Sequence, residues 1–180
     1  MGILGRLSRW IGTEGEMTHI VAGNIAPGFA LKGLDGKEYF LGKLIEHGPV
    51  VAAFFKISCP VCQFTFPFLE RLYQRYGGDG VTFLGISQDD ARSTKEFAGE
   101  YRVMFPMLMD AKGYPVSNAY GLTNVPTIFL IDTDGTVKVS CMGFDKSDLE
   151  TIGTELAERR KMTPAALFRA NEAVPAHKPG

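Results

Sequence analysis

The chain has 180 residues, of which 45% are hydrophobic and 22% are charged, so it can bury a core and is neither disordered nor collagen-like. Nineteen Lys and Arg against twenty Asp and Glu leave a formal net charge of −1, without the basic excess of a nucleic-acid-binding protein. Three cysteines are too few for a secreted disulfide scaffold. We therefore predict a globular protein with no nucleic-acid partner.

Residues 1–23 are predicted to be a leader in front of the folded domain. Hydrophobic residues recur at helical spacing between Ile3 and Ile11, which indicates a short helix that lies on a membrane surface or packs on protein. The longest apolar run, Pro49–Phe55, is far shorter than a membrane span. Because the leader has no signal-peptide pattern, we expect a cytoplasmic protein rather than a membrane-bound one.

After the leader, the sequence predicts strands that alternate with helices. Phe29–Leu31 and Glu38–Leu41 flank an Asp-Gly turn and should form a hairpin. Val50–Lys56 and Val81–Ser87 are predicted as buried strands, because β-branched and aromatic residues dominate them. Between these two strands lies a predicted helix, Pro60–Tyr76, which a Gly-Gly pair would end.

The second half of the chain continues the alternation. Ser93 could cap a helix, with Glu96 placed to complete a capping box, and an Asp-Gly pair predicts a tight turn between the last two strands. The predicted elements are the helices Ser93–Tyr101 and Tyr114–Tyr120, the hairpin strands Thr127–Asp132 and Thr136–Met142, and the helix Ser147–Lys161.

This order of elements predicts an α/β domain over residues 24–161, with a central sheet covered on both faces. Residues 162–180 begin with Thr163-Pro164, a pattern that opens helices, and contain further prolines near their end. We expect a short helix followed by a loose tail in this segment.

The chemistry of the chain is concentrated in the run Cys59-Pro60-Val61-Cys62, where a buried strand ends and a helix begins. Backbone N–H groups and the dipole at a helix N-terminus favour negative charge, so we expect the pKa of Cys59 to fall below its ordinary value of about 8.5. Cys59 would then attack a disulfide and Cys62, one turn further along the helix, would resolve the product. Half of a zinc site is the alternative, but the three histidines and Cys141 are scattered along the chain.

Further motifs accompany the CxxC. Pro67 lies five residues after Cys62, and Val125-Pro126-Thr127 precedes the last hairpin. In these features the chain resembles the thioredoxin-fold thiol-disulfide oxidoreductases of the TlpA/ResA and redoxin (AhpC/TSA-like) group, which carry a helix-kinking proline and a cis-proline loop at these places. The resemblance extends from Ala22 to Gly153. Its other matching segments are Ala26–Leu31, Asp35–Lys37, Leu130–Asp132 and Asp134-Gly135.

The resemblance implies a thioredoxin-like fold, with a central mixed sheet flanked by helices and an N-terminal β-hairpin extension. It also implies dithiol-disulfide exchange, with protein disulfides as substrates and an upstream dithiol as electron donor. The only redox group would be the Cys59–Cys62 disulfide, without a prosthetic group or metal. Substrate would contact the backbone of Val125 before the cis Pro126, together with Pro60 and Val61.

Two positions depart from the resembled group. Ser58 stands where a tryptophan usually precedes the first cysteine, and Ala53 stands where thioredoxins carry a buried Asp that assists proton transfer. Water or Lys56 is then the candidate for moving the proton. A lysine near Cys59 would also lower the pKa of that thiol, although a lysine at a strand end is commonly just solvated.

Two other functions remain as alternatives. Peroxiredoxins share the hairpin and the inserted stretch, but they place a threonine three residues before the reactive cysteine, where Lys56 stands here. Metal-binding proteins of related fold, such as copper carriers, would show a CxxxC and a downstream histidine. Cys141, on the last predicted strand, is expected to be a small buried hydrophobe.

Overall fold

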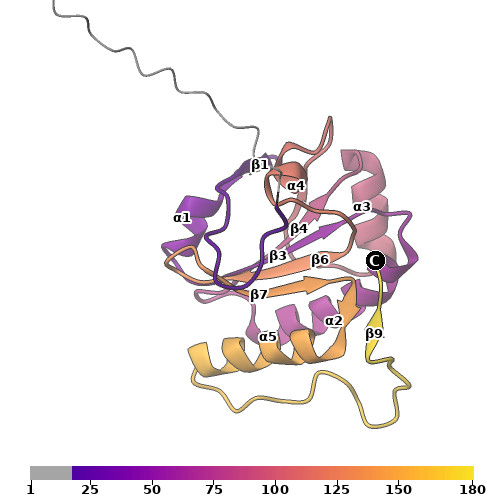
Figure 1. The fold of residues 1–180 in the computed structure, drawn as a ribbon. Helices are drawn as coiled ribbons and strands as arrows, with labels where there is room; N and C mark the ends of the chain where they lie inside the picture. The colour runs from indigo at the N-terminus through magenta and orange to yellow at the C-terminus, as the bar shows by residue number, and fades with distance from the viewer. Residues whose placement is uncertain (1–17) are drawn as a thin grey trace, which may run out of the picture.

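The computed structural model describes residues 18–180. Its central sheet has the order β5-β4-β3-β6-β7, with helices on both faces (Figure 1). The strand β3 is parallel to β4, and β4 to β5, whereas β6 is antiparallel to both β3 and β7. This is the predicted mixed sheet, with a short edge strand, β5, that the sequence analysis missed. The strands are β3 (Val50–Phe55), β4 (Thr82–Ser87), β5 (Met107–Met109), β6 (Thr127–Ile131) and β7 (Val137–Met142).

The predicted N-terminal hairpin is confirmed as a separate two-stranded sheet of β1 (Ala30–Lys32) and β2 (Glu38–Phe40). The predicted helix between Ile3 and Ile11 lies outside the described residues. Residues 18–23, at the end of the predicted leader, bond to the domain: the Ile20 N–H donates to Tyr120 O (3.1 Å) and the Gly23 N–H donates to Val137 O (2.8 Å).

Each face of the sheet has its own core. Every residue of β3 is buried, and alternate side chains point to opposite faces because the side-chain period of a strand is two. Phe55 packs in the core formed with α2, α3 and α5, whereas Phe54 packs in the core formed with α1 and α4. The helices are α1 (Leu41–Ile45), α2 (Pro60–Tyr76), α3 (Ala91–Glu100), α4 (Pro115–Ala119) and α5 (Lys146–Arg159).

The start of α3 differs from the prediction. Asp90 is the N-cap and accepts a hydrogen bond from the Ser93 N–H (2.9 Å), so the helix begins at Ala91 and Ser93 is its third residue. Glu96 does not complete a capping box; it pairs with Arg92 one turn earlier. Asp90 provides the cap at the position where a side-chain oxygen reaches the free N–H groups of the first turn.

The expected helix and loose tail over residues 162–180 are wrong. No helix forms there, and Leu167 and Phe168 are buried in the core shared by α2 and α5. The segment then continues to a short strand, β9 (His177–Lys178), which pairs with β8 (Phe144–Asp145). The segment is ordered by these tertiary contacts, which a helix starting at Thr163 would not make.

An ion pair anchors the same segment to α2. Arg71 donates from two nitrogens to the two carboxylate oxygens of Glu172 and also bonds Leu167 O (3.3 Å). The two hydrogen bonds from Arg71 to the carboxylate, with a further one from the Arg169 N–H (2.9 Å), lower the pKa of Glu172 from 4.5 to about 2.

Stability should therefore fall with acidification. The pKa of Glu172 is lower in the folded state, so its contribution is complete above pH 4.5 and is lost as the pH falls toward about 2. Urea unfolding from pH 6 to pH 2 should show a smaller pH dependence for Glu172→Gln than for the unmodified protein. Glu158→Gln, at an exposed position on α5, is the control and should keep the full dependence; equal curves for all three would contradict the prediction.

Candidate active site

Cys59 occupies the N-cap position of α2. Its backbone is extended (φ −81°, ψ 115°), and its sulfur accepts a hydrogen bond from the Cys62 N–H (3.3 Å). Pro60 follows at the first helical position, where a missing N–H costs nothing because that N–H would be unpaired in any case. The sulfur thus takes the place that a serine or aspartate oxygen has in an ordinary cap.

A loop 66 residues further along the chain completes the surroundings of this sulfur. The Cys59 thiol donates to the carbonyl oxygen of Val125 at 3.2 Å, and the Val125–Pro126 peptide bond is cis. The loop is held in turn by Thr127, whose hydroxyl donates to Asn124 O (2.8 Å). The structure therefore brings together the CxxC and the Val-Pro-Thr motif singled out in the sequence.

The two cysteines differ sharply in exposure. Cys59 is partly exposed, whereas Cys62 is completely buried. Burial raises the pKa of Cys62 well above its ordinary value; Cys59 and the charge of Asp89 raise it further, and a backbone hydrogen bond from Lys56 offsets part of the rise. An incoming molecule can reach Cys59 first.

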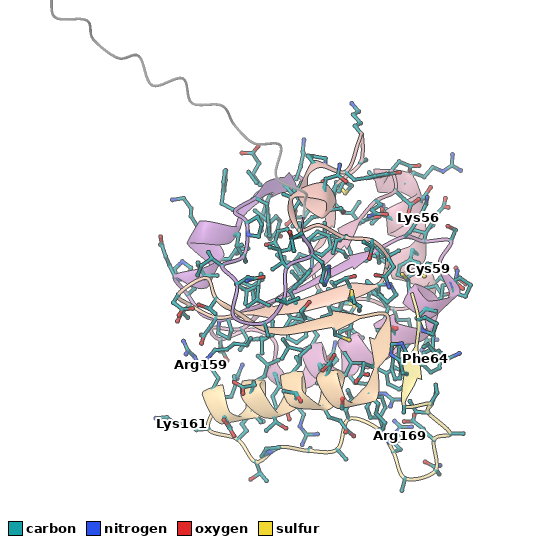
Figure 2. All side chains as sticks on the ribbon, viewed as in Figure 1. Lys56, Cys59, Phe64, Arg159, Lys161 and Arg169 are labelled. Atoms are coloured by element: carbon teal, nitrogen blue, oxygen red, sulfur yellow. The ribbon has the colours of Figure 1, made fainter. Side chains whose placement is uncertain are left out.

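The other predicted site residues have distinct positions. Val61 is half-buried against the core beside Cys59, and Pro67 lies inside α2 with its ring exposed. Lys56 has an exposed side chain, and its carbonyl accepts a hydrogen bond from the Cys59 N–H (3.1 Å). Among the contacts described for Cys59, Lys56 takes part through its backbone carbonyl and not through its side chain. Figure 2 labels Lys56 and Cys59 at the same edge of the molecule.

Asp89 is a site residue that the sequence analysis missed. Its carboxylate accepts a hydrogen bond from the Ile57 N–H (2.8 Å), while Gln63 donates to the Ile57 carbonyl (2.9 Å). The segment that leads to Cys59 is therefore held from both sides. The available signal was the position of Asp89 just after β4, since the carboxyl ends of parallel strands meet at one edge of a sheet.

Ala53, which replaces the buried Asp of thioredoxins, is itself buried in β3. Within residues 18–180, Asp89 is an acidic group whose charge acts on Cys62. Cys141 is completely buried in β7, and burial raises the pKa of its thiol to about 12, as expected for a cysteine that only packs. Its thiol donates to Gly143 O (3.7 Å) rather than to either cysteine of the CxxC.

No group of three or more His, Cys, Asp or Glu within residues 18–180 is arranged to hold a metal ion. In the same part of the chain, every helix is too short or too polar to cross a membrane.

Comparison with known proteins agrees with this geometry. The model of the AhpC/TSA family matches residues 22–140. Thiol-disulfide oxidoreductase ResA of Geobacillus thermodenitrificans is 33% identical over 137 residues, which are 75% of this chain and 78% of that protein. ResA of Bacillus anthracis is 34% identical over 122 residues, 67% of this chain and 69% of that protein.

Solved structures show the same fold. The structure of MTB dsbF, in mixed oxidised and reduced forms, has a TM-score of 0.63 at 28% identity and covers 76% of this chain and 99% of that one. Peroxidoxin BcpB from Mycobacterium tuberculosis has a TM-score of 0.64 at 26% identity, and the match covers 81% of this chain and 99% of that one. With the paired cysteines at the start of α2, these matches lead to one conclusion: the chain belongs to the AhpC/TSA family and is a thiol-disulfide oxidoreductase with a thioredoxin-like fold.

Proposed function

We propose that the protein reduces disulfide bonds of other proteins, with Cys59 as the attacking thiol and Cys62 as the resolving thiol. The observation that carries the proposal is the difference between the two sulfurs. Cys59 is partly exposed and bonded to Val125 O and the Cys62 N–H, whereas Cys62 is buried behind it. Substrate can meet only the first, and only the second can reach the product.

The reaction proceeds in two exchanges. The Cys59 thiolate attacks one sulfur of the substrate disulfide, the substrate S–S bond breaks, and the departing sulfur takes up a proton. Cys62, after losing its proton, attacks Cys59 in the mixed disulfide and releases the second substrate thiol. Two electrons have then moved to the substrate, and the Cys59–Cys62 disulfide remains. A partner dithiol restores both thiols.

Substrate would bind as an extended segment beside Val125 and Pro126, with Pro60 and Val61 forming the opposite side. The Val125 carbonyl accepts a hydrogen bond from the Cys59 thiol, so a substrate chain that pairs with this backbone would lie beside the reactive sulfur. Asp89 lies close enough for its charge to act on Cys62 and supplies a candidate acceptor for the proton that Cys62 loses.

The reduction potential tests the direction. Equilibration of the Cys59–Cys62 pair with glutathione buffers should give a midpoint below about −220 mV, in the range of reducing proteins. A midpoint near about −120 mV would mark an oxidant and overturn the proposal. Cytoplasmic location, which would favour reduction, remains a prediction that cell fractionation would check.

A thiol peroxidase is the second candidate, favoured by the match to the AhpC/TSA family and by the likeness to peroxidoxin BcpB. Lys56 replaces the hydroxyl residue of peroxiredoxins, so no side-chain O–H precedes Cys59 by three residues.

We expect hydrogen peroxide to oxidise Cys59 at least about a hundredfold more slowly than a dedicated peroxidase, because a positioned proton donor contributes on the order of 10²–10⁴ in rate. Stopped-flow measurement with Lys56→Thr and the control Lys56→Ala would check this. Only the threonine variant should become faster; rapid peroxide turnover by the unmodified protein would move the assignment to the peroxidases.

A further inference from the structure

Residues 177–180 run along the edge of the site. The strand β9 pairs with β8 through Phe144↔Lys178 and Asp145↔His177, and the Lys146 N–H donates to Ala176 O (2.9 Å). This pairing directs the chain past the start of α5 toward the CxxC. In Figure 1 the last residues extend upward from β9 beside the central sheet.

Gly143 lets this segment approach the site. Its φ is +72°, and a Cβ built there would lie 2.3 Å from Lys178 O and 2.8 Å from Gly180 N. Any side chain at position 143 would therefore displace the segment. The Gly143 N–H donates to Pro126 O (2.7 Å), so one residue touches both the segment and the Val-Pro loop.

The last residue lies against the atom that accepts the reactive thiol. A Cβ built on Gly180 would be 2.5 Å from the carbonyl oxygen of Val125, the same oxygen that accepts the Cys59 thiol (3.2 Å). Two residues earlier, Lys178 Nζ lies 5.0 Å from the centroid of the Phe64 ring on α2. Figure 2 labels Cys59 and Phe64 on the side of the molecule along which this segment runs.

We propose that residues 177–180 are a displaceable strap over the backbone of Val125 beside Cys59, so that a protein substrate must push them aside before it pairs with Val125. This proposal rests on the proposed function, since it concerns the same substrate-contacting residues. The occupant that displaces the strap is an extended polypeptide segment around a disulfide, because the strap itself reaches this place from the strand β9 and sets a glycine against Val125.

The strap is held weakly compared with the segment before it. Residues 177–180 make a two-residue strand pair, one cation–π contact and a His177–Asp145 contact of 3.6 Å, and Pro179 and Gly180 are exposed. The preceding segment is anchored by the buried Leu167 and Phe168. The strap can therefore open while the rest of the segment stays in place.

Removal of the strap provides the first test. A variant that stops after Ala176 should reduce insulin about five- to tenfold faster than the full chain, because the state with Val125 uncovered is no longer a minor population. Labelling of Cys59 by a polyethylene-glycol maleimide should accelerate similarly, whereas labelling by N-ethylmaleimide should change less than about twofold. An unchanged or slower rate in a folded truncated protein, judged by circular dichroism, would overturn the strap.

Point variants keep the test decisive if the truncated protein does not fold. Gly180→Val places a side chain where Val125 O leaves no room, and Lys178→Ala removes the cation over Phe64; each should speed bulky labelling about two- to fivefold, in line with the strength of one such contact. Arg75→Ala removes a similar contact, 5.8 Å from the Tyr76 centroid at the C-terminal end of α2, away from the strap. It is the matched control and should have no effect; equal acceleration in all three would contradict a local strap.

The two proposals fail separately in these measurements. A full chain that labels slowly with the bulky maleimide but does not reduce insulin, with or without residues 177–180, would exclude the proposed function and retain the strap. A full chain that reduces insulin at the same rate as the truncated protein would retain the function and exclude the strap.

Discussion

Cys62→Ser should turn the protein into a trap that remains covalently joined to its substrates. Cys59 would still attack, because it is the partly exposed sulfur, but no second thiol would lie close enough to release the product. Mixed disulfides should accumulate on a non-reducing gel and disappear with dithiothreitol. Cys59→Ser should trap nothing and lower exchange to the uncatalysed rate, since serine is a poor nucleophile without an activating base.

Alkylation rates measured against pH would distinguish the thiols independently of any substrate. Burial raises the pKa of Cys62 well above its ordinary value, so its thiolate is scarce at pH 7 and we expect it to react at least about a hundredfold more slowly than Cys59. Cys141→Ser is the matched control, because that thiol is buried with a pKa of about 12. A dependence of turnover on Cys141, or faster alkylation of Cys62 near neutral pH, would contradict the assigned roles.

Phe66→Ala should cost about 3–5 kcal/mol of unfolding free energy, the range for deleting a buried phenylalanine. Phe66 is completely buried on α2, with its ring centroid 4.5 Å from Phe55 and 5.2 Å from Phe97. It joins the helix that begins at Cys59 to the sheet, so its loss also loosens the support of the site.

Urea unfolding at pH 7 measures this effect, and Phe40→Ala provides the comparison. Phe40 is 40% exposed at the end of β2, where truncation should cost less than about 1 kcal/mol, as for most surface positions. A cost below about 2 kcal/mol at Phe66 would mean that the surrounding rings close the cavity.

Most of the α/β framework could be predicted because its signals are local. The apolar run of β3, the proline and glycine at the ends of α2, and the Asp-Gly turn between β6 and β7 each act through neighbouring residues. The strand β5 gave no comparable signal, since three residues do not establish a period. The start of α3 was misplaced by two residues because Asp90, not Ser93, provides the cap.

The candidate site also combines features that local sequence predicts with features that it does not. Cys59 could be placed at a helix start from the sequence alone, because the cap depends on adjacent backbone N–H groups. Its contact with Val125 O joins residues 66 positions apart and was expected only through the resemblance to a known group. The position of Asp89 just after β4 was its only signal in the sequence, since its partner is the backbone of Ile57, just after β3.

The course of residues 162–180 was decided only by tertiary structure. Thr163-Pro164 favours a helix locally, but Leu167 and Phe168 gain more by entering the core beside α2 and α5. The approach of Gly180 to Val125 depends on the β8–β9 pair and on Gly143, both distant in sequence. Local pattern therefore determined the reactive cysteine pair and its helix. The contact of Cys59 with Val125, the acidic neighbour Asp89 and the strap depend instead on backbone contacts between distant segments, which side-chain pattern does not encode.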